Sequence, residues 1–106
     1  MTNEDLPIFT KREFDERLLT LDVSTKLREG DELMSFMAVS ASGWGEADTG
    51  TLTVTMHPTD PIGGDDNTEL NFIAEGGVSG QDYLVALRYT STMEQALESI
   101  CRVSVV

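Results

Sequence analysis

One stretch decides the fold, Glu75–Thr90, which has the sequence EGGVSGQDYLVALRYT. Its first half is rich in glycine, the residue that most easily adopts the positive φ values of a tight loop, at Gly76, Gly77 and Gly80. Its second half alternates apolar with other residues, which predicts a strand with one buried face, formed by Tyr83, Val85, Leu87 and Tyr89. A loop that joins the two sheets of a β-sandwich has this form. We expect Tyr83 to bury its ring and to hydrogen-bond its hydroxyl to nearby backbone.

The residues before this stretch supply partner strands. Residues 13–28 fit a helix through Phe14, Leu18 and Leu21, but the alternating LTLDV of residues 19–23 favours a strand, followed by one helical turn at residues 24–27. Residues 32–42 are apolar on both faces, as in a central strand, and a short buried helix has the same composition. Residues 51–56 predict a strand that turns one face to the core, with Leu52, Val54 and Met56.

The remaining segments complete an all-β pattern. Residues 57–67 are rich in Pro, Gly, Asp and Asn, which predicts an exposed, mobile loop. Residues 69–75 return as a strand, whose core face is Leu70, Phe72 and Ala74 or else Phe72 and Ile73. A last strand is expected over residues 97–105, although residues 96–100 also fit a helical turn. The sum is an antiparallel β-sandwich of about six or seven strands.

Length and charge limit the domain organisation and the partners. A chain of 106 residues fits one domain, which we place at residues 13–106 after an extended N-terminal arm at residues 1–12. The net charge of -12 repels phosphate backbones and anionic membranes, so we expect no direct binding to nucleic acid or membrane. The charge serves solubility or else matches a basic partner surface. The N-terminus lacks a secretory signal, which predicts synthesis in the cytoplasm.

Four apolar side chains are candidates for partner contacts. Leu6, Ile8 and Phe9 interrupt an otherwise polar arm, and they either tuck against the domain or dock on a neighbouring subunit. Trp44 stands between two glycines, and its ring either folds over the core or forms an exposed anchor for a protein or sugar partner.

The sequence carries no catalytic signature. Ser79 has Gly77 two residues before it but Gln81 two residues after it, so the Gly-x-Ser-x-Gly pattern of serine hydrolases is incomplete. His57 is the single histidine and Cys101 the single cysteine, which excludes a zinc site rich in His or Cys and an intramolecular disulfide. Cys101 alternates with Val103, which favours a buried core residue over a reactive thiol. We expect a protein that is not an enzyme and needs no metal or other cofactor.

The order of the segments resembles a family of small immunoglobulin-like (Ig-like) proteins encoded among the structural genes of tailed bacteriophages. The resemblance covers most of the chain and lies in residues 7–11, 17–24 with Leu27, 30–33, 51–54, 76–85 and 102–106. Residues 58–67 are an insertion relative to that pattern, and the residues after Thr92 lack the short Gly-Arg turn expected there. These two departures leave the register of the last two strands open.

The resemblance implies a virion structural protein with an Ig-like β-sandwich. Such a module binds other virion proteins, either portal, adaptor and tail proteins at the head-tail junction, proteins along the tail, or the capsid that it decorates. Multiple copies would follow the symmetry of the particle, and Leu6, Ile8, Phe9 and Trp44 would carry the contacts. The protein would be made in the host cytoplasm and located in the virion. The alternative is a carbohydrate- or ligand-binding module of the same fold, with Trp44, Tyr83 or Tyr89 as a stacking platform.

Overall fold

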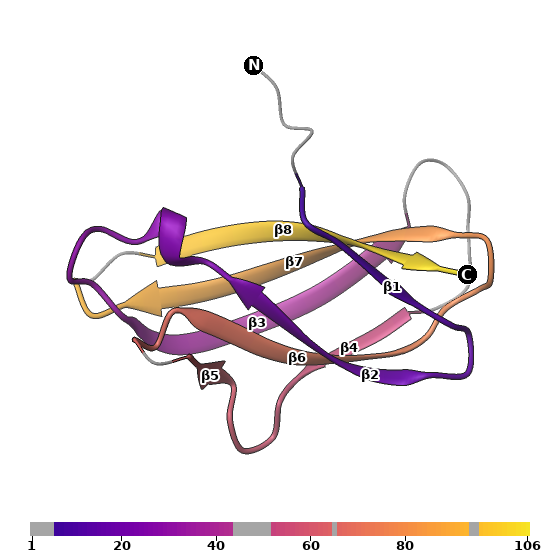
Figure 1. The fold of residues 1–106 in the computed structure, drawn as a ribbon, viewed down its shortest axis with the longest axis horizontal. Helices are drawn as coiled ribbons and strands as arrows, with labels where there is room; N and C mark the ends of the chain where they lie inside the picture. The colour runs from indigo at the N-terminus through magenta and orange to yellow at the C-terminus, as the bar shows by residue number, and fades with distance from the viewer. Residues whose placement is uncertain (1–5, 44–51, 65, 94–95) are drawn as a thin grey trace.

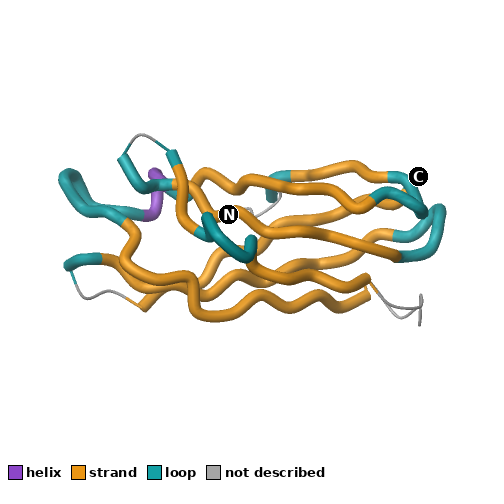
Figure 2. The backbone as a smooth tube through the Cα atoms, turned by 90° about the horizontal axis from the view of Figure 1, so that it is seen from below, coloured by secondary structure: helices purple, strands orange, loops and turns teal. Residues whose placement is uncertain are grey.

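The computed structural model describes residues 6–43, 52–64, 66–93 and 96–106, and these form two packed β-sheets (Figure 1). Sheet A has the strand order β1-β8-β7-β3 and sheet B the order β2-β6-β4, with β5 beside β6. Figure 2 shows the two sheets as separate layers. The described strands are β1 (Ile8–Lys11), β2 (Glu16–Asp22), β3 (Leu33–Gly43), β4 (Leu52–Met56), β5 (Ile62–Gly63), β6 (Glu69–Gly76), β7 (Asp82–Ser91) and β8 (Ala96–Val105). The all-β, two-sheet prediction is therefore confirmed.

The glycine-rich loop joins the sheets as expected, because it leads from β6 of sheet B into β7 of sheet A. Gly77 has a φ of +91°, and a Cβ atom there would lie 2.8 Å from Val105 Cγ2, so the residue needs both the freedom and the small size of glycine. The Tyr83 hydroxyl accepts a hydrogen bond of 2.9 Å from the Val78 N–H. The inward residues of β7 are all buried, at Tyr83, Val85, Leu87, Tyr89 and Ser91.

Sheet B pairs β6 between β2 and β4, and the alternation of its residues sets the core. Leu70, Phe72 and Ala74 of β6 are fully buried, which confirms the first of the two expected core faces. Leu19 and Leu21 of β2 are buried beside them, opposite Phe72 and Leu70, and a single 3-10 turn, η1 (Ser24–Lys26), follows β2 as predicted. Residues 13–28 therefore form a strand and a helical turn rather than a helix.

The prediction that residues 32–42 form a central strand is wrong in one respect. The segment is a strand, β3, but it lies at the edge of sheet A, and Met34 and Met37 are more than half exposed. Two irregularities in its register with β7, one on each side of Ser35–Phe36, turn these methionines out of the core. Met56 at the end of β4 is likewise partly exposed. The run of apolar residues in the sequence therefore did not reveal whether this strand is buried on both faces or on one face only.

Two strands were not predicted. β1 occupies part of the expected arm and pairs in parallel with β8, so residues 8–11 belong to sheet A, and the sheet is not wholly antiparallel. β5 contributes two residues within the turn-rich tract and pairs with Leu70 and Glu69 of β6. Together they raise the described strands to eight, against the six or seven expected.

The last strand settles the register that the sequence left open. β8 is extended from Ala96 onward, and Tyr83 lies opposite Val103 and Val85 opposite Cys101. Cys101 is fully buried, and burial raises the pKa of its thiol to about 12, which confirms a core residue rather than a reactive thiol.

Candidate partner-binding surface

The N-terminal candidates have separate positions. Phe9 faces the core and packs edge-to-face on Phe72, with ring centroids 6.1 Å apart. Ile8 points to the outer side of sheet A with 60% of its surface exposed, and Leu6 lines a groove beside β8. One side chain therefore tucks against the domain, while the other two lie where a partner can reach them. Trp44 falls outside the described residues.

Leu6, Ile8 and Phe9 lie along one side of the sandwich, where β1 and β8 of sheet A face β2 of sheet B. We call this side the seam. In one half of the seam β1 covers β8: the Arg102 N–H donates to the Pro7 carbonyl (2.9 Å), and the Val106 N–H donates to the Lys11 carbonyl (2.8 Å). Lys11 is 2% exposed, and its Nζ donates to the Gly76 carbonyl at 2.6 Å and to the Arg12 carbonyl at 2.7 Å. Side chains and backbone from both sheets thus close this half.

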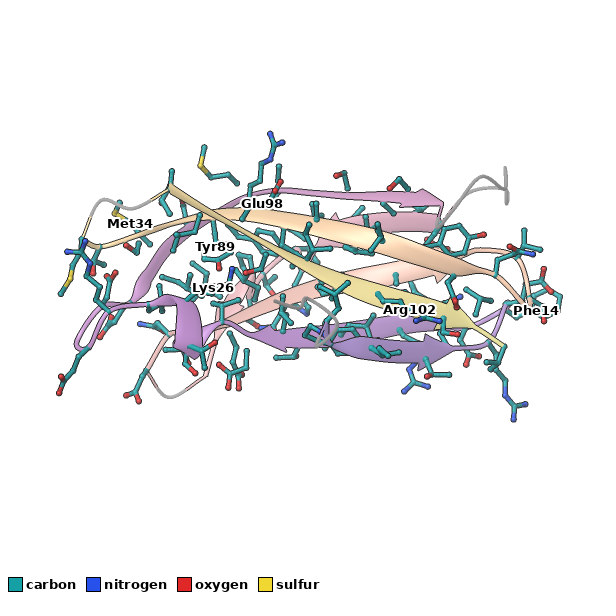
Figure 3. The ribbon with its side chains drawn as sticks, turned by 90° about the horizontal axis from the view of Figure 1, so that it is seen from above. Phe14, Lys26, Met34, Tyr89, Glu98 and Arg102 are labelled. Atoms are coloured by element: carbon teal, nitrogen blue, oxygen red, sulfur yellow. The ribbon has the colours of Figure 1, made fainter. Side chains whose placement is uncertain are left out.

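The other half of the seam contains a groove of about 380 Å³. Leu21 of β2 and Val23, which directly follows this strand, line the groove but are almost fully buried, and Leu6 and Ile100 contribute partly exposed apolar surface from the β1–β8 side. Charged and polar residues also line it, at Asp22, Thr25, Lys26, Glu98 and Ser99. Figure 3 places Lys26 of η1 between that turn and β8. The groove has the composition of a protein-contact site, with apolar walls and polar groups around them.

The outer face of sheet A next to the seam has internally paired charges. Arg102 forms an ion pair with Asp82, and the Arg88 Nε lies 3.0 Å from the Glu98 Oε2. The exposed pair of Arg88 and Glu98 adds little to stability, the pair of Arg102 and Asp82 is partly buried, and together they neutralise both arginines of this face. Ile8 and Ile100 therefore lie next to a surface without a free excess of positive charge.

The outer face of sheet B is acidic by contrast. The register places Glu16 directly opposite Glu75 and Asp22 directly opposite Glu69. Carboxylates that face each other across a strand pair repel, and no Lys or Arg occupies an outward register position among the described strands of this sheet. This face therefore carries four carboxylates without a facing Lys or Arg among the described strands, and it would favour a basic partner.

The stacking platform of the alternative prediction is not formed by the tyrosines. Tyr83 and Tyr89 are each 1% exposed, and the Tyr89 hydroxyl is 2.7 Å from the Ser99 Oγ in the core. A sugar ring cannot reach either face of these aromatic rings. The physical reason is their position on the inward face of β7, which the alternation had indicated.

The side chains that could ligate a metal ion are not grouped together among the described residues. Among the described residues no group of three or more His, Cys, Asp or Glu side chains is placed to hold a metal ion. His57 Nδ1 accepts hydrogen bonds from the N–H groups of Thr59 and Asp60, so this side chain organises a turn. Asp31 accepts hydrogen bonds from the Thr92 hydroxyl and the Met93 N–H, which tie the loop before β3 to the turn after β7.

The groove residues could not be identified from the sequence because they come from three separate segments, residues 6–7, 21–26 and 98–100. Ile100 gave the one usable signal, since it is an apolar residue on the outward face of an otherwise regular strand, and it remains 39% exposed. Phe14 is a second exposed apolar residue, at 98%, in the turn between β1 and β2.

Comparison with known proteins finds no match among protein-family models, curated sequences or solved structures. None of the described residues belongs to a helix of the length and apolar character needed to cross a bilayer.

Proposed function

We propose that this protein is a non-enzymatic virion structural protein of a tailed bacteriophage, an Ig-like module that binds other virion proteins. The partners are portal, adaptor, tail or capsid proteins, and several copies assemble with the symmetry of the particle. The order of sequence segments that resembles small Ig-like phage proteins supports the assignment. So does a two-sheet β fold whose apolar N-terminal residues are divided between the core and the surface.

The observation that carries the proposal is the exposed apolar surface on and beside β1. Ile8 is held in a paired strand, with Phe9 next to it anchored on Phe72. An apolar side chain on a rigid strand loses little entropy when a partner covers it. Leu6 and Ile100 extend this surface into the groove, so the contact area includes the exposed side chain of Ile8 and the groove beside it.

Two measurements test the proposal. The first is quantitative mass spectrometry of particles produced from the genome that encodes the protein. We expect the chain in purified particles at a fixed copy number that matches a ring or a capsid lattice. Its absence from the particles would remove the virion assignment.

The second measurement replaces Leu6 and Ile8 together with serine and follows incorporation into particles. Met37→Ser is the matched control, since Met37 is 59% exposed against 60% for Ile8 and lies at the opposite edge of the same sheet. We expect the double variant to fold but to be lost from particles, and the control to be retained. Equal retention of both variants would rule out the β1 surface as the virion contact.

A further inference from the structure

The backbone of β8 is paired unevenly on its two sides. Along β7 the pairing runs from Ala96 to Ser104, but along β1 it begins only at Arg102. In an antiparallel ladder alternate residues direct both backbone groups toward the same neighbour. Because the Arg102 N–H points to β1, the N–H and C=O groups of Ile100 and Glu98 point the same way. No described residue pairs with them there.

These open backbone groups face the groove in the seam, since Glu98, Ser99 and Ile100 all line it. No described strand pairs with the facing edge of sheet B, which is formed by β2. The Val23 N–H donates to the Thr68 carbonyl, away from the groove, so by alternation the backbone of Asp22 points toward it. Two strand edges thus line a space whose walls are apolar at Leu21 and Val23.

We propose that the groove binds an extended segment of a partner protein, which adds to sheet A as a strand along residues 96–101 of β8. The segment occupies the row that β1 takes further along, and its alternate apolar side chains pack on Leu6 and Ile100, the partly exposed apolar residues of the groove. A strand of about five residues spans the roughly 17 Å of β8 that no described strand pairs with on this side. Basic flanking residues suit the partner because the chain carries a net charge of -12.

A strand is favoured over other occupants by the open backbone. A compact apolar ligand would fill the walls but leave the groups of Glu98 and Ile100 unpaired and partly removed from water, which costs free energy. A strand satisfies them and uses the apolar walls at once. The inference deepens the proposed function, since it names how a virion partner is held, but its test does not require the particle.

The test measures amide hydrogen exchange by NMR on the full chain, with and without an acetylated, amidated peptide of sequence Lys-Val-Thr-Val-Thr-Val-Lys. In the free protein we expect the Ile100 and Glu98 amides to exchange at least tenfold faster than the Arg102 amide, which is bonded to Pro7. Saturating peptide should slow both to the rate of Arg102. The control peptide is N-methylated at every valine and threonine, so it keeps the side chains and charge but loses the backbone donors.

Three outcomes would overturn the proposal. The Ile100 and Glu98 amides are already protected in the free chain, which would mean that the chain itself pairs them. Alternatively, the peptide leaves their exchange unchanged, or the N-methylated peptide protects them equally. Ile100→Pro, which removes the N–H at a strand edge, should abolish peptide binding, whereas Ile100→Val should retain it. If the peptide binds in the groove but the protein is absent from particles, strand addition stands and the virion assignment is removed. If the protein is present in particles but the peptide does not bind, the virion assignment stands and strand addition is removed.

Discussion

The two halves of the seam differ in what fills them, although the same strand, β8, runs through both. Where β1 covers β8, Phe9 packs on Phe72 and the buried Lys11 bonds to backbone carbonyls across the sandwich. Where β1 is absent, Ser99 and Cys101 remain buried from the β7 side, but a groove takes the place of a neighbouring strand. No described strand pairs with this part of β8 on the β1 side, whereas β1 adds Phe9 and Lys11 to the packed interior of the other half. We expect changes in the closed half to lower stability and changes in the groove half to affect binding.

The largest effect should come from the glycine loop beside the closed half. Gly77→Ala meets a positive φ and a Cβ contact of 2.8 Å to Val105, and its cost should be about 2–5 kcal/mol of unfolding free energy. Gly80→Ala has a similar φ of +88° but no atom within 4 Å of the added carbon, and it should cost about 1–2 kcal/mol. Urea unfolding of both variants measures the difference. Equal costs would mean that Val105 and the seam around it yield to the extra atom.

The second comparison is between neighbours on β1. Phe9→Ala removes a partly buried ring and its edge-to-face contact, and it should cost about 2–3 kcal/mol. Ile8→Ala, one residue away on the outward face, should cost less than about 0.5 kcal/mol. Chemical denaturation compares them, with unchanged m-values as the check that both remain two-state. A large loss for Ile8→Ala would show that this side chain stabilises the free domain, which would weaken its role as a partner contact.

The sequence predicted the strands that have a buried face, since alternation of side chains follows from the geometry of a pleated strand. It identified Tyr83 and its hydrogen bond, and the inward face of β7, because each lies within one segment, but it left two alternative inward faces for β6. It missed β1 because Pro7 and an irregular apolar pattern hide the pairing, which depends on residues 102–105 almost a hundred positions away. It missed β5 because two residues among prolines and glycines carry no period.

The candidate site was predicted less completely than the fold. Leu6, Ile8 and Phe9 were predicted either to pack on the domain or to contact a partner, but the groove beside them is also lined by Leu21, Val23 and Ile100. Those residues read as ordinary core or strand positions, because nothing in a sequence tells where an edge strand stops short of its neighbour. The error at β3 has the same origin, since edge and centre positions depend on the order of strands in the sheet.

A pH-dependent effect is expected near the turns that flank the groove half, at Asp31. Burial alone would raise the pKa of this carboxyl, but hydrogen bonds from Ser91, Thr92 and the backbone N–H groups of Met93 and Glu32 hold it below its usual value of 3.8. A lowered folded pKa contributes stability that is present above the unfolded pKa and lost as the pH falls through the folded one. The domain should therefore lose stability below about pH 4 partly through this group.

The variant Asp31→Asn isolates that contribution. It should be less stable than the wild type at neutral pH, and the difference should shrink as the pH falls from roughly 6 to 2. Glu29→Gln removes one charge from the same loop at an exposed position and serves as the control. Urea unfolding across the range gives the measurement. A constant difference between Asp31→Asn and wild type would show that the carboxylate charge plays no part in tying this loop to the turn after β7.

The smallest expected effect concerns β2, the sheet B edge of the seam. Glu75→Lys converts the like-charge pair with Glu16 into an attractive one and should stabilise the domain by about 0.2–1 kcal/mol at low salt. Thr55→Lys adds one positive charge to the same face opposite Ile73, whereas Glu75→Lys changes the charge by two, so net charge alone predicts half the shift for Thr55→Lys. A thermal shift for Glu75→Lys that is more than twice the shift for Thr55→Lys, and that is reduced by salt, would show that repulsion between Glu16 and Glu75 weakens the pairing of β2. A twofold ratio would assign the gain to net charge alone.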